Sequence, residues 1–455
     1  MKKIRTIITI FAILATLQSC SLFKSTQKSE DATNVETADG LWIETDNAPQ
    51  ANVTNVRYEI DLDSMTGNGY TFEIPESMNA DIDSLLNSWQ ARNMLNKLDC
   101  NGSEWESFPI TDTMYAKRLA ALPTIVRMPY NNMVRACIDR YTKKGRSQVS
   151  YLLGISEFYF PIIEEEIDRV GVPHELKYLP IIESALNPKA TSRMGAKGLW
   201  QFMFTTGKLY GLKANNYIDE RFDPSKATTA ALLYLKDLYD MFQNWELAIA
   251  AYNCGPGNVK KAIKRSGGST DFWKIYPWLP RETRGYLPGF IAASYIMTYY
   301  EDHGICPMEP EMPIATDTIH INKNLHFNQI VEVCGADIEE IRTLNPQYLK
   351  DIIPGENETY ILRLTNNTIT KFVENEDTVY KHNADKYFPK ANIEKMLKEA
   401  KENNGAGNLI RHKIKNGETL GSIALKYRVS VKKIMKWNNL RNSNIRAGKY
   451  LKIYK

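Results

Sequence analysis

The chain has 455 residues, of which 43% are hydrophobic and 24% charged, a composition that excludes a chain disordered throughout. At this length we expect two to four domains. The net charge of +4 is unevenly spread, because residues 409–455 hold thirteen Lys and Arg and a single acid, Glu418, so that this segment is +12 and the rest of the chain −8. So basic a segment favours a polyanionic partner.

The N-terminus has the pattern of an exported lipoprotein. A basic start precedes an apolar run at residues 7–17, which is too short to span a bilayer but suits a signal peptide over 1–19. Leu-Gln-Ser-Cys follows in the order of a bacterial lipobox, so we expect cleavage before Cys20 and lipidation of its thiol. A plain signal peptide with a chance cysteine is the alternative. We expect a lipid anchor in the cell envelope, at the outer membrane facing the periplasm, and no nucleic-acid partner.

The next segments change from polar to helical patterns. Residues 20–79 are predicted to be a flexible tether and 80–150 a helical lead-in. Residues 151–305 contain few strand-like runs, which favours a compact all-α domain. Within it, Asp223 and Pro224 form a helix start, with Asp as the N-cap and Pro at the first helical position. The apolar residues that follow at helical spacing are Ala227, Ala231, Leu235, Leu238 and Phe242.

The C-terminal third repeats itself after a shift of 93 residues. Several spaced matches with the same flanking pattern predict two copies of one small module, at 316–365 and 409–455, joined by a polar linker at 366–408. The matched pairs are Ile330 with Ile423, Ile341 with Ile434, Asn345 with Asn438, and Gly355 with Gly448.

Cysteines and histidines suggest no metal site and no cofactor. Apart from Cys20, the five cysteines form no CxxC or other metal-ligand spacing, and the six histidines are scattered. A single disulfide is as compatible with the sequence as none. The five are Cys100, Cys137, Cys254, Cys306 and Cys334.

A glutamate occupies the apolar stripe of a predicted helix. Leu176, Leu179, Glu183 and Leu186 follow helical spacing, with Pro180 expected to kink the helix just before the glutamate. A carboxyl group among leucines loses hydration, which raises its pKa and suits it to act as a general acid. A structural glutamate paired with an arginine is the alternative.

Three later motifs, taken in order with Glu183-Ser184, favour a catalytic over a structural role for Glu183. They are Gly198-Leu199-Trp200-Gln201, Ala251-Tyr252-Asn253 and Glu282-Thr283-Arg284-Gly285-Tyr286. Together they resemble the lytic transglycosylase family built on the goose-type lysozyme fold. Trp200 stands where many relatives carry methionine, which is expected to alter a sugar subsite without removing activity.

The resemblance implies a single catalytic acid and base, Glu183, acting on peptidoglycan. The protonated carboxyl would donate to the glycosidic oxygen between N-acetylmuramic acid and N-acetylglucosamine, and the carboxylate would then deprotonate the 6-hydroxyl of the same muramic acid, which closes a 1,6-anhydro ring. A lysozyme-like hydrolase and a non-catalytic wall-binding protein are the alternatives. The resemblance places around the substrate Ser184, Ser192, Gln201, Met203, Tyr252, Asn253 and Tyr286.

The C-terminal copies resemble LysM domains, βααβ units that bind glycans containing N-acetylglucosamine. The first copy lacks the Gly-Glu-Thr-Leu start of the last one, which puts its glycan affinity in doubt. The expected fold is therefore an all-α lysozyme-like catalytic domain followed by small α+β (βααβ) LysM modules. The resemblance implies glycan-binding loops in the last copy that contain Gly417, Glu418, Thr419, Leu420, Asn438 and Asn439.

Overall fold

The computed structural model describes residues 71–97, 109–310, 316–401 and 409–454, the last range with gaps at single positions. Cys20, the predicted signal peptide and most of the predicted tether lie outside the described residues. Within them, no helix has both the length and the apolar character needed to cross a membrane.

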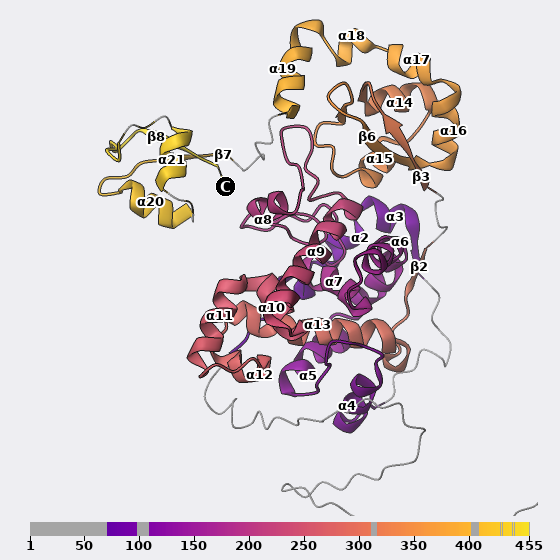
Figure 1. The fold of residues 1–455 in the computed structure, drawn as a ribbon. Helices are drawn as coiled ribbons and strands as arrows, with labels where there is room; N and C mark the ends of the chain where they lie inside the picture. Colours follow the sequence, from indigo (N-terminus) through magenta and orange to yellow (C-terminus); the bar gives the residue numbers. More distant parts are fainter. Residues whose placement is uncertain are drawn as a thin grey trace, which may run out of the picture. The chain divides into compact units, whose positions relative to one another are not determined.

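Residues 71–310 form a helical domain (Figure 1). A two-stranded antiparallel pair, β1 (Leu95–Lys97) with β2 (Met308–Pro310), joins its beginning and end. Short 3₁₀ or π helices occur at Glu76–Asn79, Arg140–Lys144, His174–Tyr178, Tyr276–Trp278 and Glu301–His303. The α-helices are α2 (Ile82–Leu86), α3 (Trp89–Met94), α4 (Asp112–Ala121), α5 (Asn132–Asp139), α6 (Arg146–Val170), α7 (Leu179–Ser184), α8 (Phe204–Leu209), α9 (Pro224–Phe242), α10 (Trp245–Cys254), α11 (Pro256–Arg265), α12 (Phe272–Ile275) and α13 (Arg281–Tyr299).

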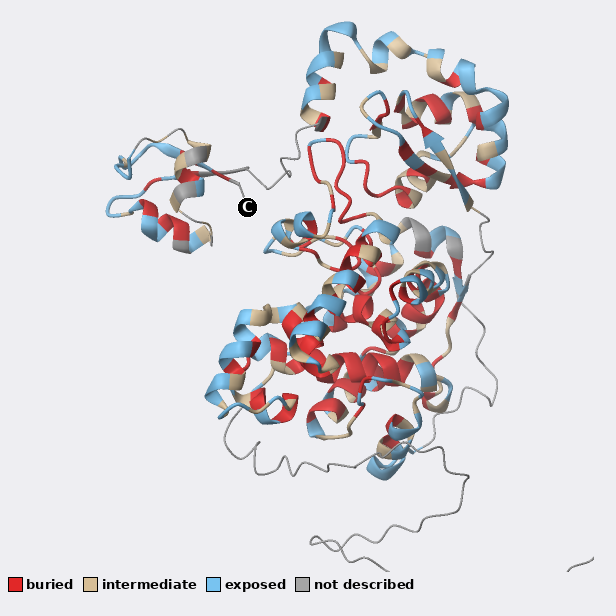
Figure 2. Ribbon diagram, in the orientation of Figure 1, coloured by how far each residue is buried: buried red, intermediate tan, exposed pale blue. Residues whose placement is uncertain are grey.

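One hydrophobic core runs through this domain, including the predicted lead-in. Helices α10 and α13 are buried along most of their length and pack against each other (Figure 2). Helix α9 starts as predicted, because the Asp223 carboxylate accepts hydrogen bonds from the amides of Ser225 and Lys226 (both 3.0 Å) and Pro224 follows. The expected all-α domain is confirmed.

The end of the predicted tether is part of this domain. Met78 is fully buried in the core, and the Ser77 hydroxyl donates to the carbonyl of Ile182 at 2.5 Å. The amide of Glu73 donates to the Arg281 carbonyl at 3.2 Å. Residues 71–79 therefore lie along α7 and α13 rather than forming a flexible tether. The sequence conceals this because the few apolar residues here, such as Phe72, Ile74 and Met78, form no regular helical stripe.

Gly285 on α13 lies where the backbone of residues 71–79 crosses this helix, and the close approach requires a residue without a side chain. A Cβ atom there would lie 1.9 Å from the Glu73 carbonyl oxygen, whereas a Cβ on Gly257 in α11 would meet nothing within 4 Å. We expect Gly285→Ala to lower the free energy of unfolding by about 1–3 kcal/mol and to release residues 71–79 to protease. Gly257→Ala should be neutral or slightly stabilising. Chemical denaturation and limited proteolysis of both variants measure this, and equal stabilities would contradict the crossing.

The first C-terminal module has the βααβ order with an additional pair of short strands inside it. Strand β3 (Thr316–Ile321) pairs antiparallel with β6 (Tyr360–Thr365), and a second pair joins β4 (Asn324–His326) to β5 (Ile352–Pro354). Between them lie α14 (Phe327–Cys334) and α15 (Ile338–Leu344). The hydrophobic core of the module contains residues from each of these elements, among them Ile330, Ile341 and Leu362.

The segment 366–408, expected to be a linker, is helical as far as residue 401. Phe372, Val379, Met396 and Ala400 are buried in the core of the first module, which explains why so polar a segment is ordered. Its charged residues form the outer faces of amphipathic helices, a pattern that composition alone does not distinguish from a linker. The helices are α16 (Asn366–Glu374), α17 (Glu376–Lys381), α18 (Ala384–Tyr387) and α19 (Lys390–Lys401).

The last module repeats this order with β7 (Leu409–Lys413), α20 (Leu420–Tyr427), α21 (Val431–Trp437) and β8 (Tyr450–Tyr454), and β7 pairs antiparallel with β8. One side chain shows that the copies are equivalent. The Asn438 amide bonds to the Ile434 carbonyl and to both the carbonyl and amide of Lys452, and Asn345 makes the same three bonds with Ile341 and Arg363. The α+β fold expected of the C-terminal modules is confirmed.

Candidate active site

Glu183 lies near the end of the short helix α7. A 3₁₀ helix leads into α7, and Pro180 occupies its first turn, where the missing N–H costs no helical hydrogen bond. The helix ends at Ala185, which adopts the left-handed conformation with φ 52°. The prediction of one helix kinked at Pro180 is therefore wrong. Pro180 begins a new helix, and Leu186 lies beyond its end.

Burial changes the acidity of the Glu183 carboxyl. Glu183 is partly buried between the buried residues Ile182 and Ser184, and desolvation raises its pKa to about 7, although a hydrogen bond from Tyr286 partly opposes the shift. The Tyr286 hydroxyl donates to Glu183 Oε1 at 2.5 Å. Burial, and then the nearby Glu183 charge, raise the pKa of Tyr286 well above its usual value, so this hydroxyl keeps its proton. Glu183 can thus be protonated near neutral pH.

Two predicted residues at the end of α10 flank this pair. The Tyr252 hydroxyl donates to the Trp200 carbonyl at 2.8 Å, and burial followed by the Glu183 charge raises its pKa. Asn253 is exposed, and its Oδ1 accepts a hydrogen bond from the hydroxyl of Thr283 at 2.7 Å. These bonds join α10 both to α13 and to the segment that contains Trp200.

That segment, residues 190–203, is called the substrate loop below. The hydroxyl of Ser184, next to the catalytic candidate, donates to the Leu199 carbonyl at 2.9 Å. Gln201 has φ 47°, and its side-chain amide donates to the Gly198 carbonyl at 2.8 Å. The loop is therefore fastened to α7 through Ser184 and to α10 through Tyr252.

Ser192 and Met203 lie farther along the same loop. The Ser192 hydroxyl accepts a hydrogen bond from the Ala196 amide at 3.0 Å, and the Met203 side chain is 44% exposed. In the part of the chain that the structure describes, neither is hydrogen-bonded to Glu183. Their predicted contact with sugar remains a prediction.

Trp200 does not face a sugar site. It is fully buried, and its indole N–H donates to the Thr228 hydroxyl on α9 at 2.8 Å. The expectation that Trp200 alters a sugar subsite is therefore wrong for its ring. The left-handed backbone at Gln201 turns the chain directly after the tryptophan, so that neighbouring side chains point in different directions.

The described residues among those predicted to bind glycan in the last module lie just before α20, at its first position, or just after α21. Gly417 is exposed with φ 82°, whereas Leu420 is a core residue. The Glu418 carboxylate accepts hydrogen bonds from the amide of Lys415 and pairs with His412, so it serves the module's own structure. The Asn438 side chain is likewise used internally, Thr419 is exposed, and Asn439 lies outside the described residues.

The structure also shows which other groups surround the site. Burial raises the pKa of Glu183, the hydrogen bond from Tyr286 lowers it, and no carboxylate of the described residues contributes to the shift. No group of three or more His, Cys, Asp or Glu side chains in the same residues could hold a metal ion. Cys306 is disulfide-bonded, whereas Cys137, Cys254 and Cys334 are free thiols.

Sequence reasoning missed the charged residues behind the substrate loop. Asp219 and Arg221 are buried and hydrogen-bonded to each other. In the sequence they stand in Asp-Glu-Arg-Phe-Asp-Pro, which has the composition of a surface loop. Opposite charges two positions apart were the only available signal, and that signal is weak.

Comparison with known protein families gives three matches. The Transglycosylase SLT domain family matches residues 160–275, the family described as Lytic transglycosylase MltD, LysM-like domain, matches 315–381, and the LysM domain family matches 412–453. All the site residues on α7, α10 and the substrate loop fall within the first match.

Individual relatives and one solved structure are also similar to parts of the chain. Membrane-bound lytic murein transglycosylase D of Escherichia coli (strain K12) is 31% identical over 336 residues, which are 72% of this chain and 70% of the relative. The soluble lytic murein transglycosylase of the same strain is 33% identical over 26% of this chain and 19% of its own length. The solved structure of lytic transglycosylase Slt from Pseudomonas aeruginosa matches 33% of this chain and 26% of that chain at 22% identity, with a TM-score of 0.27. The chain belongs to the family of the membrane-bound lytic murein transglycosylase D and is a lytic transglycosylase.

Proposed function

We propose that this chain cleaves the β-1,4 bond between N-acetylmuramic acid and N-acetylglucosamine in peptidoglycan without water, leaving a 1,6-anhydro-muramic acid end. The observation that carries the proposal is the Glu183 carboxyl, with a pKa of about 7 and a Tyr286 hydroxyl as its hydrogen-bond partner. Glycosidases that use water typically position two carboxyl groups at the scissile bond. Among the described residues, no second carboxylate contributes to the pKa shift of Glu183, which favours a mechanism with one carboxyl group.

The proposed reaction balances with this single group. Protonated Glu183 donates its proton to the glycosidic oxygen as the bond to C1 of the muramic acid breaks. The carboxylate left behind takes the proton of the 6-hydroxyl of the same sugar, whose oxygen forms the new bond to C1. Glu183 ends protonated, ready for another cycle. Tyr286 stabilises the intermediate carboxylate, because its hydroxyl donates to Oε1.

The remaining parts of the chain are proposed to bring the enzyme to its substrate. The basic last module would bind the glycan and its anionic surroundings through the loops near Gly417 and Asn438. A lipid on Cys20 would hold the chain in the envelope, at the outer membrane facing the periplasm. The relative from E. coli is membrane-bound by name, which supports envelope association and wall turnover as the role.

Product analysis tests the proposed reaction. Purified peptidoglycan is digested with the chain that begins after Cys20, and the released muropeptides are separated and weighed. We expect products lighter by one water than those of a hydrolase. Products with reducing ends would instead indicate a lysozyme-like hydrolase, and glycan binding without any product would indicate a wall-binding protein.

The pH dependence follows from the raised pKa of Glu183. Its acid form is the one that starts the reaction, so kcat/KM should fall as pH rises through about 7. Removing the Tyr286 hydroxyl removes a bond that favours the carboxylate, which raises this pKa further. We therefore expect Tyr286→Phe to be slower at its optimum, with its alkaline limb displaced to higher pH. A full pH profile of both proteins measures this, and a displacement to lower pH would contradict the assignment.

A further inference from the structure

The segment between α8 and α9, residues 210–223, bonds the helical domain to the first module. Its Asp219 amide donates to the Gln347 carbonyl at 2.9 Å, and the Leu349 amide donates to the Tyr217 carbonyl at 2.8 Å. Two backbone hydrogen bonds in opposite directions form a short antiparallel contact, which fixes the position of the main chain at Asp219.

Side chains extend the same contact. The two backbone hydrogen bonds make Ile218 and Tyr348 an isolated antiparallel bridge, which brings the side chains on either side of it to the module. Tyr217 and Ile218 are 9% and 2% exposed and belong to the hydrophobic core of the module, although they come from the helical domain. The Asn215 side-chain amide donates to the Ala400 carbonyl on α19 at 2.7 Å. The segment is therefore built into the module rather than resting on its surface.

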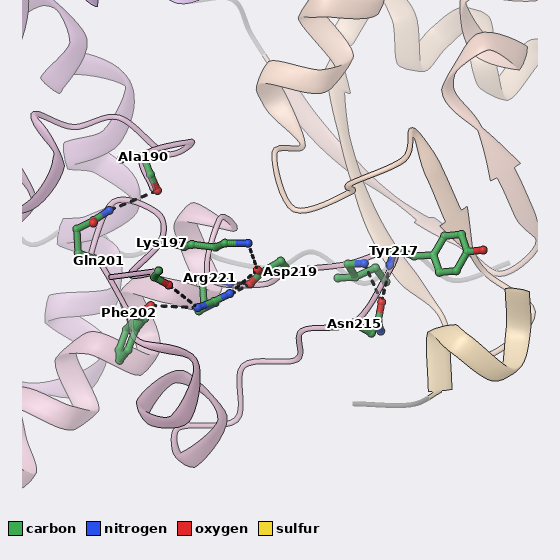
Figure 3. A network of polar contacts seen from close by, with 10 residues as sticks. Ala190, Lys197, Gln201, Phe202, Asn215, Tyr217, Asp219 and Arg221 are labelled. Carbon is green, nitrogen blue, oxygen red and sulfur yellow. Dashed lines mark hydrogen bonds and ion pairs between the residues drawn. The ribbon is translucent and has the colours of Figure 1, made fainter. Parts of the chain in front are cut away.

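The other side of this segment holds the substrate loop (Figure 3). The fully buried carboxylate of Asp219 accepts two hydrogen bonds from Arg221, at 2.9 and 2.7 Å, and pairs with Lys197 at 3.1 Å. Arg221 also donates to the carbonyls of Gly195 (3.2 Å) and Phe202 (3.4 Å). The Asp219 carboxylate thus binds both Arg221 and Lys197. Lys197 belongs to the substrate loop, and Arg221 is bonded to the loop at two further residues.

The contact uses the segment that follows the second helix of the module. Residues 345–359, which include β5, follow α15 as residues 438–449 follow α21, and Asn345 and Asn438 mark the same position in each. In the last module, residues 442–444 of this loop are exposed. In the first module, the corresponding loop bears Gln347 and Leu349, which are bonded to the helical domain.

We propose that the first LysM-like module is a clamp on the catalytic domain, which holds the substrate loop in place through the positioning residues Asp219 and Arg221. Its α15–β6 loop is occupied by this contact and does not bind glycan. Displacing the module moves the main chain at Asp219, releases Arg221 and Lys197, and loosens the loop that carries Gln201. The kinetic part of this inference rests on the proposed cleavage of glycan.

Two variants of the full chain test the clamp. Ile218→Asp puts a charge into the core of the module and undocks it, and Asp219→Asn keeps the shape while removing the charge that both cations share. We expect KM for glycan to rise roughly 10-fold in each, with a smaller change in kcat, because a loosened loop binds substrate poorly. A merely smaller folded fraction would lower kcat and leave KM unchanged.

Hydrogen exchange gives a readout that does not depend on activity. We expect the amides of residues 190–202 to exchange faster in both variants than in the unaltered chain. The matched control is Glu358→Gln, which breaks the half-exposed Lys213–Glu358 ion pair (2.5 Å) between the same two parts without reaching the loop, and it should behave like the unaltered chain.

Unchanged KM and unchanged exchange in Ile218→Asp and Asp219→Asn would overturn the clamp. Faster exchange in the Glu358→Gln control as well would also overturn it, because the effect would then not run through Asp219. If the unaltered chain gives no anhydro products, the proposed function fails, while hydrogen exchange still decides whether the module holds the loop.

Discussion

Replacing Glu183 with glutamine should slow glycan cleavage by about 10³-fold or more, because one positioned acid–base group contributes roughly 10²–10⁴-fold and Glu183 is used in both proton transfers. Glutamine has nearly the same shape, and its carbonyl oxygen can still accept the hydrogen bond from Tyr286. The initial rate of soluble product release from purified peptidoglycan measures the loss. A residual rate above a tenth of the original would mean that another group supplies the proton.

Glu175 provides the matched control. It is a buried glutamate on the preceding 3₁₀ helix, and its carboxylate accepts a hydrogen bond from the Val126 amide at 2.5 Å, away from Glu183. Glu175→Gln should leave the rate of cleavage near that of the unaltered chain. Equal losses in both variants would show that the effect is one of folding.

Glu183→Gln should also show how much the buried Glu183 carboxylate lowers the free energy of unfolding. The pKa of Glu183 is raised from 4.5 in the unfolded chain to about 7 in the fold, so its ionisation favours unfolding as pH rises through this window. A neutral glutamine removes this cost, which we place at roughly 1–3 kcal/mol above pH 7. The variant should therefore be more stable than the unaltered chain at pH 8 and equally stable at pH 4, as chemical denaturation would show.

Local signals in the sequence predicted the elements that depend on neighbouring residues. The Asp223-Pro224 start is such a signal, since the N-cap bonds to amides two and three positions later. The repeat was visible because the same asparagine, Asn345 or Asn438, is needed wherever the second helix meets the closing strand. Glu183 was found from its leucine neighbours and the later motifs, even though the helix around it is shorter than the pattern suggested.

Features that depend on distant contacts could not be predicted in the same way. Residues 71–79 and 366–401 are polar enough for linkers, and only packing against α13 and against the module core shows otherwise. Trp200 was predicted to contact sugar because tryptophan often stacks on sugar rings. Its indole N–H is instead bonded to the buried Thr228, which is 28 positions away in the sequence. Asp219 lies among charged residues in sequence, and its buried carboxylate is bound by Arg221 and by Lys197, which is 22 positions away.

Gly198 should be the most demanding position of the substrate loop. Its φ of 80° disfavours any side chain, and a Cβ atom there would lie 1.8 Å from the Arg221 carbonyl oxygen. Gly195 in the same loop has φ 82° and open space around its Cβ position. We expect Gly195→Ala to cost only backbone strain, about 1–2 kcal/mol, and Gly198→Ala to cost about 1–3 kcal/mol more because of the clash.

The two alanine variants separate strain from close packing at the site. If the Arg221 backbone must lie against Gly198, Gly198→Ala pushes apart the loop and the segment that the first module holds, so cleavage should fall by roughly 10²-fold even in the folded fraction. Denaturation gives the stability difference between the variants, and product release per folded molecule gives the activity. Equal stabilities for Gly195→Ala and Gly198→Ala would mean that the loop can move away from Arg221 at no cost in free energy. A contact that is so easily displaced could not position Gln201.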